Sequence, residues 1–289
     1  MSSIRRIGLV QQAVGDDLER NLARAESAVR EAAARGAQLV CLQELFRTRY
    51  FPQREDAALF ELAETIPGPT TERMSKLAAD AGVVLVVPLF EKRAPGLYHN
   101  SAVVLERDGS QLAHYRKMHV PDDPLFYEKF YFAPGDLGFH CVDTSAGRVG
   151  VLICWDQWFP EAARLLALDG AEFLFYPTAI GYLEGESDSE NAAMRDSWLT
   201  VQRGHAIANG VFVCAANRVG DEGAGVRFWG SSFAADPQGR MLAQASDSRE
   251  EVLVVECDLG RIETQRRGWP FLRDRRIDAY GDLLARFRR

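Results

Sequence analysis

The sequence predicts an α/β protein in which two sheets pack together and helices cover their outer sides. Two observations predict this class. Short apolar runs rich in β-branched residues alternate with segments of helical periodicity. The order strand, helix, strand, helix, strand, hairpin also occurs twice, which indicates an internal repeat of two related halves. Because no linker or low-complexity segment separates the halves, we interpret residues 1–289 as one domain.

The first half is expected to begin with a strand from Ile4 to Gln11. A helix follows, since Asp16 or Asp17 can cap it and Gly36 can end it. Its apolar face at helical spacing consists of Leu18, Leu22, Ala25, Val29 and Ala33. The remaining expected elements are a strand at 38–45, a helix at 70–80, a strand at 83–90 and a hairpin of 101–107 and 111–115 that turns at Asp108-Gly109.

The second half repeats this order. A strand at 149–153 leads into a helix that begins at Pro160 and stops at Gly170, because proline fits the first helical turn and glycine favours a helix end. The elements expected after it are a strand at 172–176, a helix at about 189–209, a strand at 211–215 and a hairpin of 231–235 and 241–245 that turns at Pro237-Gln238-Gly239.

Composition narrows the classes of function. Hydrophobic residues make up 47% and charged residues 26% of the chain, which is ordinary for a soluble globular protein, and no apolar run is long enough to span a membrane. The net charge of −7 argues against a nucleic-acid partner and favours a cationic small molecule. The five cysteines form no CxxC pair or zinc-like spacing, and the N-terminus has no signal-peptide pattern. We therefore expect a reduced, metal-free, cytoplasmic protein.

Cys154 lies where the strand at 149–153 ends and the Pro160 helix is about to begin. Ligands of α/β proteins bind at this edge of the sheet, and a side chain on a sharp turn there is exposed to them. A nearby helix N-terminus also favours the thiolate over the thiol. Cys154 is therefore a candidate nucleophile. The alternative is a buried structural cysteine, the more common role of a lone cysteine in an apolar strand.

Three other residues can supply what a thiol nucleophile needs, namely a base and a group that stabilises negative charge. Glu44 interrupts an apolar run at the end of a first-half strand, which suits a base. Lys117 directly follows the first hairpin and can hold an oxyanion, and Glu128 is a second acid among aromatic residues. Taken singly, each of the three is equally consistent with an ordinary surface charge.

Together, the four positions resemble the nitrilase superfamily of carbon–nitrogen hydrolases, whose members share a Glu, a Lys and a Cys at strand edges. The matching motifs are Gln-Glu-Leu-Phe around Glu44, Tyr-Arg-Lys-Met-His-Val-Pro around Lys117 and Ile-Cys-Trp-Asp-Gln-Trp-Phe-Pro-Glu around Cys154. The additional glutamate of many members matches Glu128 in Glu-Lys-Phe-Tyr-Phe-Ala-Pro-Gly-Asp. The resemblance extends from about Ile4 to the Trp-Pro-Phe segment that begins at Trp269.

The resemblance implies a four-layer αββα sandwich and hydrolysis of a linear amide without any cofactor. It implies that Glu44 accepts the proton of the Cys154 thiol and that Glu128 positions water. Lys117 and a backbone N–H near Trp155 are expected to hold the oxyanion. Within the superfamily, three segments are most similar to amidases that hydrolyse N-carbamoylputrescine, namely the one after Cys154, 176–181 and 202–209. N-carbamoylputrescine is a small cationic carbamoyl amine.

The substrate-binding residues that the resemblance implies are Trp155, Tyr127, Thr178, Ala179, Glu184 and Glu186. One departure concerns the substrate amine. In plant-type members a glutamate shortly after Tyr-Pro-Thr-Ala-Ile-Gly faces that amine, whereas Leu183 occupies the aligned position here. We therefore expect Glu184 or Glu186, within the acidic segment 182–190, to replace it. Glu184 is preferred because it is nearer to Gly181.

Two other functions stay open. A related amidase acting on N-carbamoyl-β-alanine or on an ω-amide would need an arginine for the substrate carboxylate, and Arg195, Arg203 and Arg218 are available. The chain could also be a catalytically inactive binding protein on the same fold, although all four catalytic positions are present. Ammonia release from a carbamoyl amine would distinguish this second function from catalysis.

The last segment, 261–289, carries nine arginines together with Trp269, Phe271 and Tyr280. Arginine and aromatic residues are enriched at protein interfaces. We therefore expect this tail to pack against another subunit in a homo-oligomer, a dimer or larger. The alternative is a loosely packed, solvated end.

Overall fold

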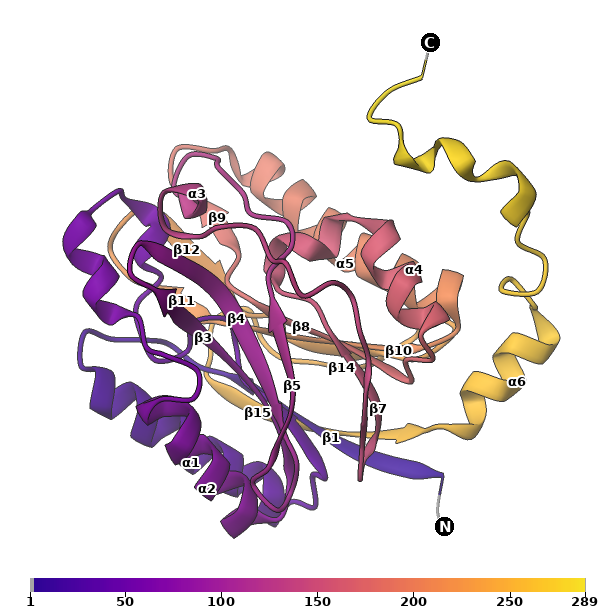
Figure 1. Ribbon diagram of the computed structural model, residues 1–289, viewed down its shortest axis with the longest axis horizontal. Helices are drawn as coiled ribbons and strands as arrows, with labels where there is room; N and C mark the ends of the chain where they lie inside the picture. The colour runs from indigo at the N-terminus through magenta and orange to yellow at the C-terminus, as the bar shows by residue number, and fades with distance from the viewer. Residues whose placement is uncertain (1–2, 289) are drawn as a thin grey trace.

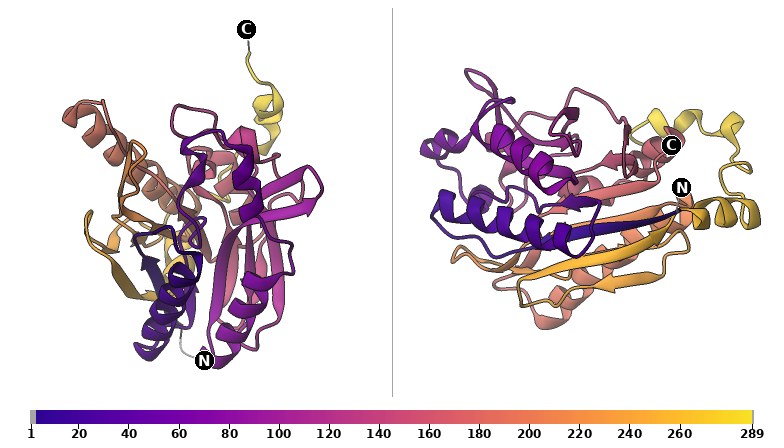
Figure 2. Two further views of the ribbon diagram at one scale, coloured as in Figure 1. Left: turned by 90° about the vertical axis from the view of Figure 1, so that its left-hand side faces the viewer. Right: turned by 90° about the horizontal axis from the view of Figure 1, so that it is seen from below.

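A computed structural model describes residues 3–288 and contains two six-stranded mixed sheets packed face to face (Figure 1). Helices cover the outer face of each sheet, so the layers run helix, sheet, sheet, helix (Figures 1 and 2). The predicted four-layer αββα sandwich is therefore confirmed.

The first sheet has the strand order β15-β1-β2-β3-β4-β5. Strands β1, β2 and β3 are parallel, whereas β4, β5 and β15 are antiparallel to their neighbours. The bounds are β1 Ile4–Gln11, β2 Leu39–Cys41, β3 Val84–Ala94, β4 Leu97–Leu105, β5 Gln111–Arg116 and β15 Glu251–Asp258. In Figure 2 the late strand β15 runs alongside the dark first strand β1 over its whole length.

The second sheet repeats this topology in the order β14-β13-β10-β8-β7-β6. Read from β6 to β14, an antiparallel edge strand, three parallel strands and two antiparallel strands again follow one another, as the internal repeat predicts. The bounds are β6 Val142–Thr144, β7 Gly147–Val151, β8 Phe173–Thr178, β10 Phe212–Asn217, β13 Phe233–Ala235 and β14 Met241–Gln244. A small third sheet consists of β9 Gly181–Leu183, β11 Val219–Asp221 and β12 Val226–Trp229.

The long helices carry the start and stop signals expected from the sequence. Asp17 caps the first helix, where its side chain accepts a hydrogen bond from the backbone N–H of Arg20, and Gly82 and Gly210 end two others in the left-handed conformation. The helices are α1 Leu18–Ala34, α2 Pro69–Ala81, α3 Glu128–Tyr131, α4 Pro160–Leu168, α5 Asp188–Asn209 and α6 Gly260–Gly268. Short 3₁₀ helices span Phe51–Gln53, Ala57–Leu62, Cys154–Trp158, Ile277–Ala279 and Gly281–Leu284.

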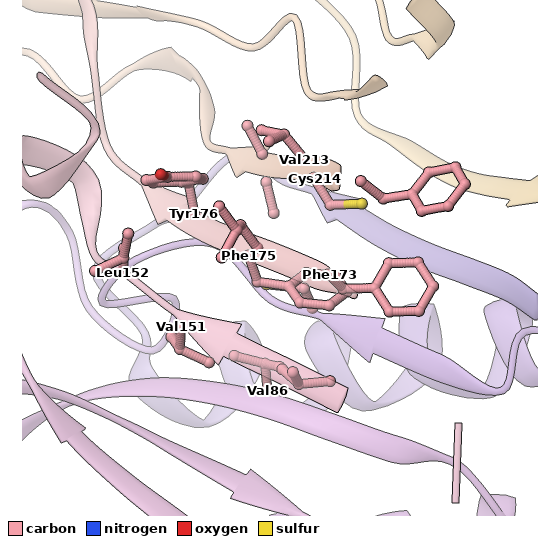
Figure 3. Packing of buried hydrophobic residues seen from close by; sticks show 14 of the residues in the cluster. Val86, Val151, Leu152, Phe173, Phe175, Tyr176, Val213 and Cys214 are labelled. Carbon is pink, nitrogen blue, oxygen red and sulfur yellow. The ribbon is translucent and has the colours of Figure 1, made fainter. Parts of the chain in front are cut away.

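Two apolar layers hold the sandwich together. The larger one lies between the sheets and extends to α4 and α5; Figure 3 shows Val86 of β3 in the same cluster as Val151, Phe173 and Phe175 of the second sheet. The other lies between the first sheet and helices α1 and α2, and includes Leu77 of α2. Burial of these side chains on both faces of each sheet explains the near-continuous apolar runs of the parallel strands.

Three expectations need correction. The strand expected at 38–45 ends at Cys41, and Leu45 adopts a left-handed φ of +49°, so the chain turns away from the sheet there. The acidic segment 182–190, for which no element was expected before about residue 189, contains the end of β9 and the beginning of α5. Strand β15 was not predicted, although it completes the first sheet by pairing with β1.

Further expectations concerned membrane-spanning helices, the state of the cysteines and the C-terminal tail. Within residues 3–288, no helix is long and apolar enough to cross a membrane. All five cysteines are free thiols. Beyond α6 the tail projects away from the body of the sandwich (Figure 1). Its exposed large apolar side chains are Trp269, Phe271, Ile277, Tyr280, Leu283, Leu284 and Phe287.

Candidate active site

Lys117 lies between two glutamates in the interior of the protein. Its Nζ atom is 2.9 Å from Glu44 Oε1 and 2.8 and 2.7 Å from the two carboxylate oxygens of Glu128. Glu44 follows β2, Lys117 follows β5 and Glu128 begins α3, so three elements meet here. The side chains of all three are fully buried. The structure therefore brings three of the four residues proposed from the sequence together in one buried charged cluster. None of the three is a surface charge.

Two residues that sequence reasoning did not identify complete the surroundings of the carboxylates. Asn100 of β4 donates a hydrogen bond from Nδ2 to Glu44 Oε1 at 2.7 Å. The Tyr50 hydroxyl donates to Glu128 Oε1 at 2.6 Å. Buried charges must be paired and hydrogen-bonded to be tolerated, and these contacts meet that requirement for Glu128 and for one of the two oxygens of Glu44. The only signal in the sequence was the polar run His99-Asn100-Ser101, which precedes the apolar end of β4.

Cys154 occupies a strained turn and interacts electrostatically with this charged cluster. Its φ of +43° lies in the left-handed region that residues other than glycine rarely adopt, and it begins the 3₁₀ helix Cys154–Trp158. Its thiol donates a long hydrogen bond of 3.8 Å to the carbonyl of Ala179. The predicted sharp turn between strand and helix is therefore present at Cys154.

The electrostatics correct one expectation about the thiol. Burial raises the pKa of Cys154 well above its ordinary value and the charge of Glu44 adds to the shift, whereas Lys117 opposes it. The thiolate is therefore not favoured as expected from the nearby N-terminus of the Pro160 helix, because burial and the charge of Glu44 raise the pKa of Cys154. The thiol is neutral at rest and needs a base to become a nucleophile.

Glu128 and Lys117 also have shifted pKa values. Burial raises the pKa of Glu128 to about 7, although Lys117 opposes the shift. For Lys117, burial alone would lower the pKa, but the charges of Glu128 and Glu44 outweigh it and raise the pKa above the ordinary value. Lys117 therefore stays cationic, while Glu128 changes charge near neutral pH.

Asp156 joins the turn of Cys154 to the segment of Lys117. Its buried carboxylate accepts hydrogen bonds from the backbone N–H of Ile153 at 2.9 Å, from the backbone N–H of His119 at 3.0 Å and from the Tyr115 hydroxyl at 2.7 Å. Ile153 directly precedes Cys154, and Tyr115 and His119 flank Lys117 on either side. One side chain therefore fixes the spacing between the thiol and the lysine.

A cavity of about 630 Å³ ends at Cys154, within the range of small-molecule sites. Three carboxylates, those of Asp123, Glu186 and Glu190, line it. The other lining residues are mainly apolar and include Pro121, Phe126, Trp155, Trp158, Ile180, Leu183 and Met194. Among the residues that line it within 3–288, there is no lysine, arginine or histidine.

The structure separates the predicted substrate-binding residues into two groups. Trp155 and Glu186 line the cavity, and Ala179 contacts the Cys154 thiol through its carbonyl. Glu184 lies in a neighbouring hollow with Tyr182 and Asp188, so the preference for Glu184 over Glu186 is not supported.

Tyr127 and Thr178 also lie outside the cavity. Phe126, rather than its neighbour Tyr127, lines the wall. The Thr178 hydroxyl donates to the backbone carbonyl of Tyr176 at 2.9 Å inside the protein. Neither side chain therefore lines the cavity, which local sequence could not indicate.

None of the three candidate arginines lines the cavity of Cys154. Arg195 forms an ion pair with Asp247 at 3.6 Å in a separate polar hollow, and the Arg203 side chain donates to the carbonyl of Gly239 at 2.8 Å. Arg218 is completely buried and contacts the backbone of Glu44 and Leu45. A carboxylate-bearing substrate would therefore lack the cationic partner that these residues were expected to supply.

The arrangement is suited to acyl transfer through a thiol. A neutral thiol on a strained turn interacts electrostatically with a carboxylate that can accept its proton and with an ammonium that can stabilise an oxyanion. A sandwich of two related α/β halves with a buried Glu–Lys–Cys cluster defines a thiol-dependent hydrolase of linear carbon–nitrogen bonds. The sequence model described as carbon–nitrogen hydrolase matches residues 6–267, and the chain belongs to this family, the nitrilase superfamily. The prediction of the family is thus confirmed.

Relatives and solved structures agree with this assignment. The chain is 46% identical over 287 residues to an N-carbamoylputrescine amidase of Solanum lycopersicum, covering 96% of this chain and 94% of the relative. It is 38% identical to a citrullinase of Francisella tularensis, covering 98% and 99% of the two chains. The crystal structure of a carbon–nitrogen hydrolase from Helicobacter pylori G27 superposes with a TM-score of 0.96 at 50% identity, covering 99% of this chain and all of that one.

Proposed function

We propose that the protein hydrolyses N-carbamoylputrescine to putrescine, ammonia and carbon dioxide. The observation that carries the proposal is the chemistry of the cavity at Cys154, whose wall is apolar and whose charged side chains are all acidic. N-carbamoylputrescine presents a neutral ureido group, four methylenes and a terminal ammonium. An apolar wall suits the methylenes, and carboxylates suit the ammonium. The similarity to N-carbamoylputrescine amidases supports the same substrate.

In the proposed first half-reaction, the free oxygen of Glu44 takes the proton of the Cys154 thiol. The thiolate then attacks the ureido carbon, and Lys117 with a backbone N–H near Trp155 stabilises the oxyanion. The bond from the ureido carbon to its terminal NH2 nitrogen breaks, and Glu44 gives its proton to this nitrogen so that ammonia departs. A carbamoyl thioester on Cys154 results.

In the second half-reaction, Glu44 accepts a proton from a water molecule that Glu128 helps to position. The hydroxide attacks the thioester carbon, and the carbon–sulfur bond breaks. Cys154 regains its proton through Glu44, and the carbamate that is released decays to carbon dioxide and the free amine. Apart from water, no group from outside the chain takes part in the proposed steps.

For the substrate ammonium we propose Glu186 and Glu190 as partners. Both line the cavity: Glu186 directly precedes Ser187, the N-cap residue of α5, and Glu190 lies in the first turn of this helix. Leu183 takes the position where plant-type members carry a glutamate, and here it contributes to the apolar wall of the same cavity. The proposed carboxylates of Glu186 and Glu190 therefore lie beyond the end of β9, one just before α5 and one in its first turn.

Citrulline is the second candidate, because a citrullinase is among the relatives and citrulline carries the same ureido group. Its α-carboxylate would need a cationic partner, and the cavity offers none among the described residues. N-carbamoyl-β-alanine and ω-amides meet the same difficulty. We therefore rank the cationic carbamoyl amine first.

A substrate panel tests the proposal. Ammonia release would be measured with N-carbamoylputrescine, N-carbamoylcadaverine, citrulline, N-carbamoyl-β-alanine, asparagine and glutamine. We expect the highest kcat/KM for N-carbamoylputrescine. A higher value for citrulline or another carboxylate would refute the proposed substrate, and no ammonia from any member would favour a catalytically inactive binding protein.

A further inference from the structure

Arg218 is a fully buried arginine whose guanidinium faces the backbone of the proposed base. Its Nη2 atom donates to the carbonyl oxygens of Glu44 at 2.9 Å, Leu45 at 3.0 Å and Thr48 at 3.3 Å. Leu45 is the residue with a φ of +49°, so these carbonyls belong to a strained turn. A turn of this kind persists only where surrounding contacts hold it, and Arg218 supplies three of them.

Glu222 is the ionic partner of Arg218 and also contacts the same segment. One of its carboxylate oxygens accepts from Arg218 Nη1 at 2.5 Å, and the other accepts from the backbone N–H of Tyr50 at 2.6 Å. Both side chains are buried, and both come from the second half of the chain, between β10 and β12. The backbone of the segment from Glu44 to Tyr50 is therefore hydrogen-bonded to both members of one buried ion pair.

The two ends of this segment carry the groups that contact the charged cluster. At one end, Glu44 contacts Lys117. At the other end, the Tyr50 hydroxyl donates to Glu128 Oε1 at 2.6 Å, and Glu128 in turn contacts Lys117. A buried ion pair is a poor means of gaining stability, because desolvation offsets its attraction and an apolar pair often serves as well. Its value here lies in hydrogen bonds that an apolar pair cannot make.

We propose that the Arg218–Glu222 ion pair and Tyr50 are positioning residues, which hold the carboxylates of Glu44 and Glu128 in register with Lys117. Arg218 fixes the backbone of Glu44, and Glu222 fixes Tyr50, whose hydroxyl orients Glu128. The inference rests on the proposed catalytic roles of the two glutamates, but not on the identity of the substrate. It replaces the earlier expectation that Arg218 binds a substrate carboxylate.

The first test replaces the ion pair by an apolar pair in the double variant Arg218→Met/Glu222→Met. Methionine fills a similar volume, so the variant can fold, but it cannot bond to the carbonyls of Glu44 and Leu45 or to the N–H of Tyr50. Small misplacements of a catalytic group cost on the order of 10- to 100-fold in rate. We therefore expect kcat to fall by that range, while KM stays within about threefold.

A matched control separates positioning from loss of stability. Leu77→Ala creates a cavity between α2 and the first sheet, far from the site, and should lower the melting temperature while kcat stays unchanged. Alkylation of Cys154 by iodoacetamide gives a readout that needs no substrate. If Glu44 is displaced, the thiol should react about tenfold more slowly or less in the double variant, whereas Leu77→Ala should match the parent.

The second test is Tyr50→Phe, which removes a single hydroxyl. The groups that face Glu128 are Lys117, Glu44, Tyr50 and the Cys154 thiol. The Tyr50 hydrogen bond favours the ionised form of Glu128, so its loss should raise the pKa of this acid. The acid limb of the kcat profile is then expected to move to higher pH by about one unit, which a merely structural role would not cause.

The outcomes decide the inference separately from the proposed function. A folded double variant whose kcat and alkylation rate stay within about threefold of the parent would overturn the role of the ion pair. An unshifted acid limb in Tyr50→Phe would overturn the role of Tyr50, and this variant decides the inference alone if the double variant does not fold. Failure of the parent to act on N-carbamoylputrescine would refute the proposed substrate, yet the alkylation comparison would still test the positioning.

Discussion

The Lys117 ammonium contacts both carboxylate oxygens of Glu128, at 2.8 and 2.7 Å, but only one oxygen of Glu44, at 2.9 Å. The second oxygen of Glu44 is buried and finds no hydrogen-bond partner among the described residues. The two acids therefore differ in whether a carboxylate oxygen remains free to accept a proton. Glu128 is the main ionic partner of the lysine, whereas Glu44 keeps an acceptor free for the proton of a thiol or of water.

Cys154→Ala is expected to abolish turnover and leave the fold intact, because the change removes the nucleophile and little packing. Iodoacetamide labelling mapped by mass spectrometry checks the assignment, with modification expected first at Cys154. Cys141 is the most accessible of the other four thiols, so Cys141→Ala is the matched control and should keep full activity. Preferential labelling of Cys41, Cys141, Cys214 or Cys257 would show that another thiol is reactive.

Glu44→Gln should reduce kcat by at least ~100-fold, the scale expected for loss of a general base. The amide keeps the shape of the side chain and one acceptor for Asn100, so the melting temperature should change little. Steady-state kinetics and thermal unfolding check the two halves of this prediction. A variant with near-normal kcat would exclude Glu44 as the base.

Lys117→Ala should also reduce kcat by at least ~100-fold, because the oxyanion loses its cation. Unlike Glu44→Gln, it leaves two buried carboxylates without their partner, which costs about 3–5 kcal/mol in the free energy of unfolding. Denaturant unfolding measures this loss. If stability falls while kcat per folded molecule is retained, Lys117 has only a structural role.

The pH dependence of kcat should report on Glu128, whose pKa burial raises to about 7. Below this pH the acid becomes neutral and loses its ionic contact with Lys117, so kcat should fall on the acid side of neutrality. Glu128→Gln is permanently neutral; its kcat should be ~100-fold lower and should show no acid limb near pH 7. An acid limb that persists unchanged in this variant would assign the titration to another group.

Glu186→Gln and Glu190→Gln test the proposed contact with the substrate ammonium. Both side chains are exposed in the free protein, so each pair is weaker than a fully buried one and should contribute ~1–1.5 kcal/mol, about a tenfold loss of kcat/KM for N-carbamoylputrescine. Glu184→Gln is the matched control, because Glu184 lies in the neighbouring hollow. If all three variants stay within about threefold of the parent, these acids do not bind the amine.

Removal of residues 269–289 tests the proposed role of the tail in a homo-oligomer. Ile277, Leu284 and Phe287 are 74%, 96% and 84% exposed, which is costly for apolar side chains unless another surface covers them. We expect the parent to be a dimer or larger and the truncated chain to have a lower mass, measured by size-exclusion chromatography with light scattering. An unchanged mass would place the interface elsewhere.

The sequence by itself determined most of the elements and the family. Periodicity marks which side of a segment is buried, and capping residues such as Asp17 and Gly170 mark its ends, so most strands and helices of both halves could be predicted locally. The position of Cys154 between a strand and Pro160 placed it at a turn on the sheet edge. The motifs around Glu44, Lys117 and Cys154 then indicated the superfamily.

Only the tertiary structure decided which residues meet. Strand β15 joins β1 across the length of the chain, and Arg218 reaches the carbonyl of Glu44, 174 residues away in sequence. Whether Glu184 or Glu186 lines the cavity depends on how β9 and α5 pack against the loop of Asp123. Local periodicity encodes that a side chain is buried, but not against which partner, because that choice is made by contacts between distant segments.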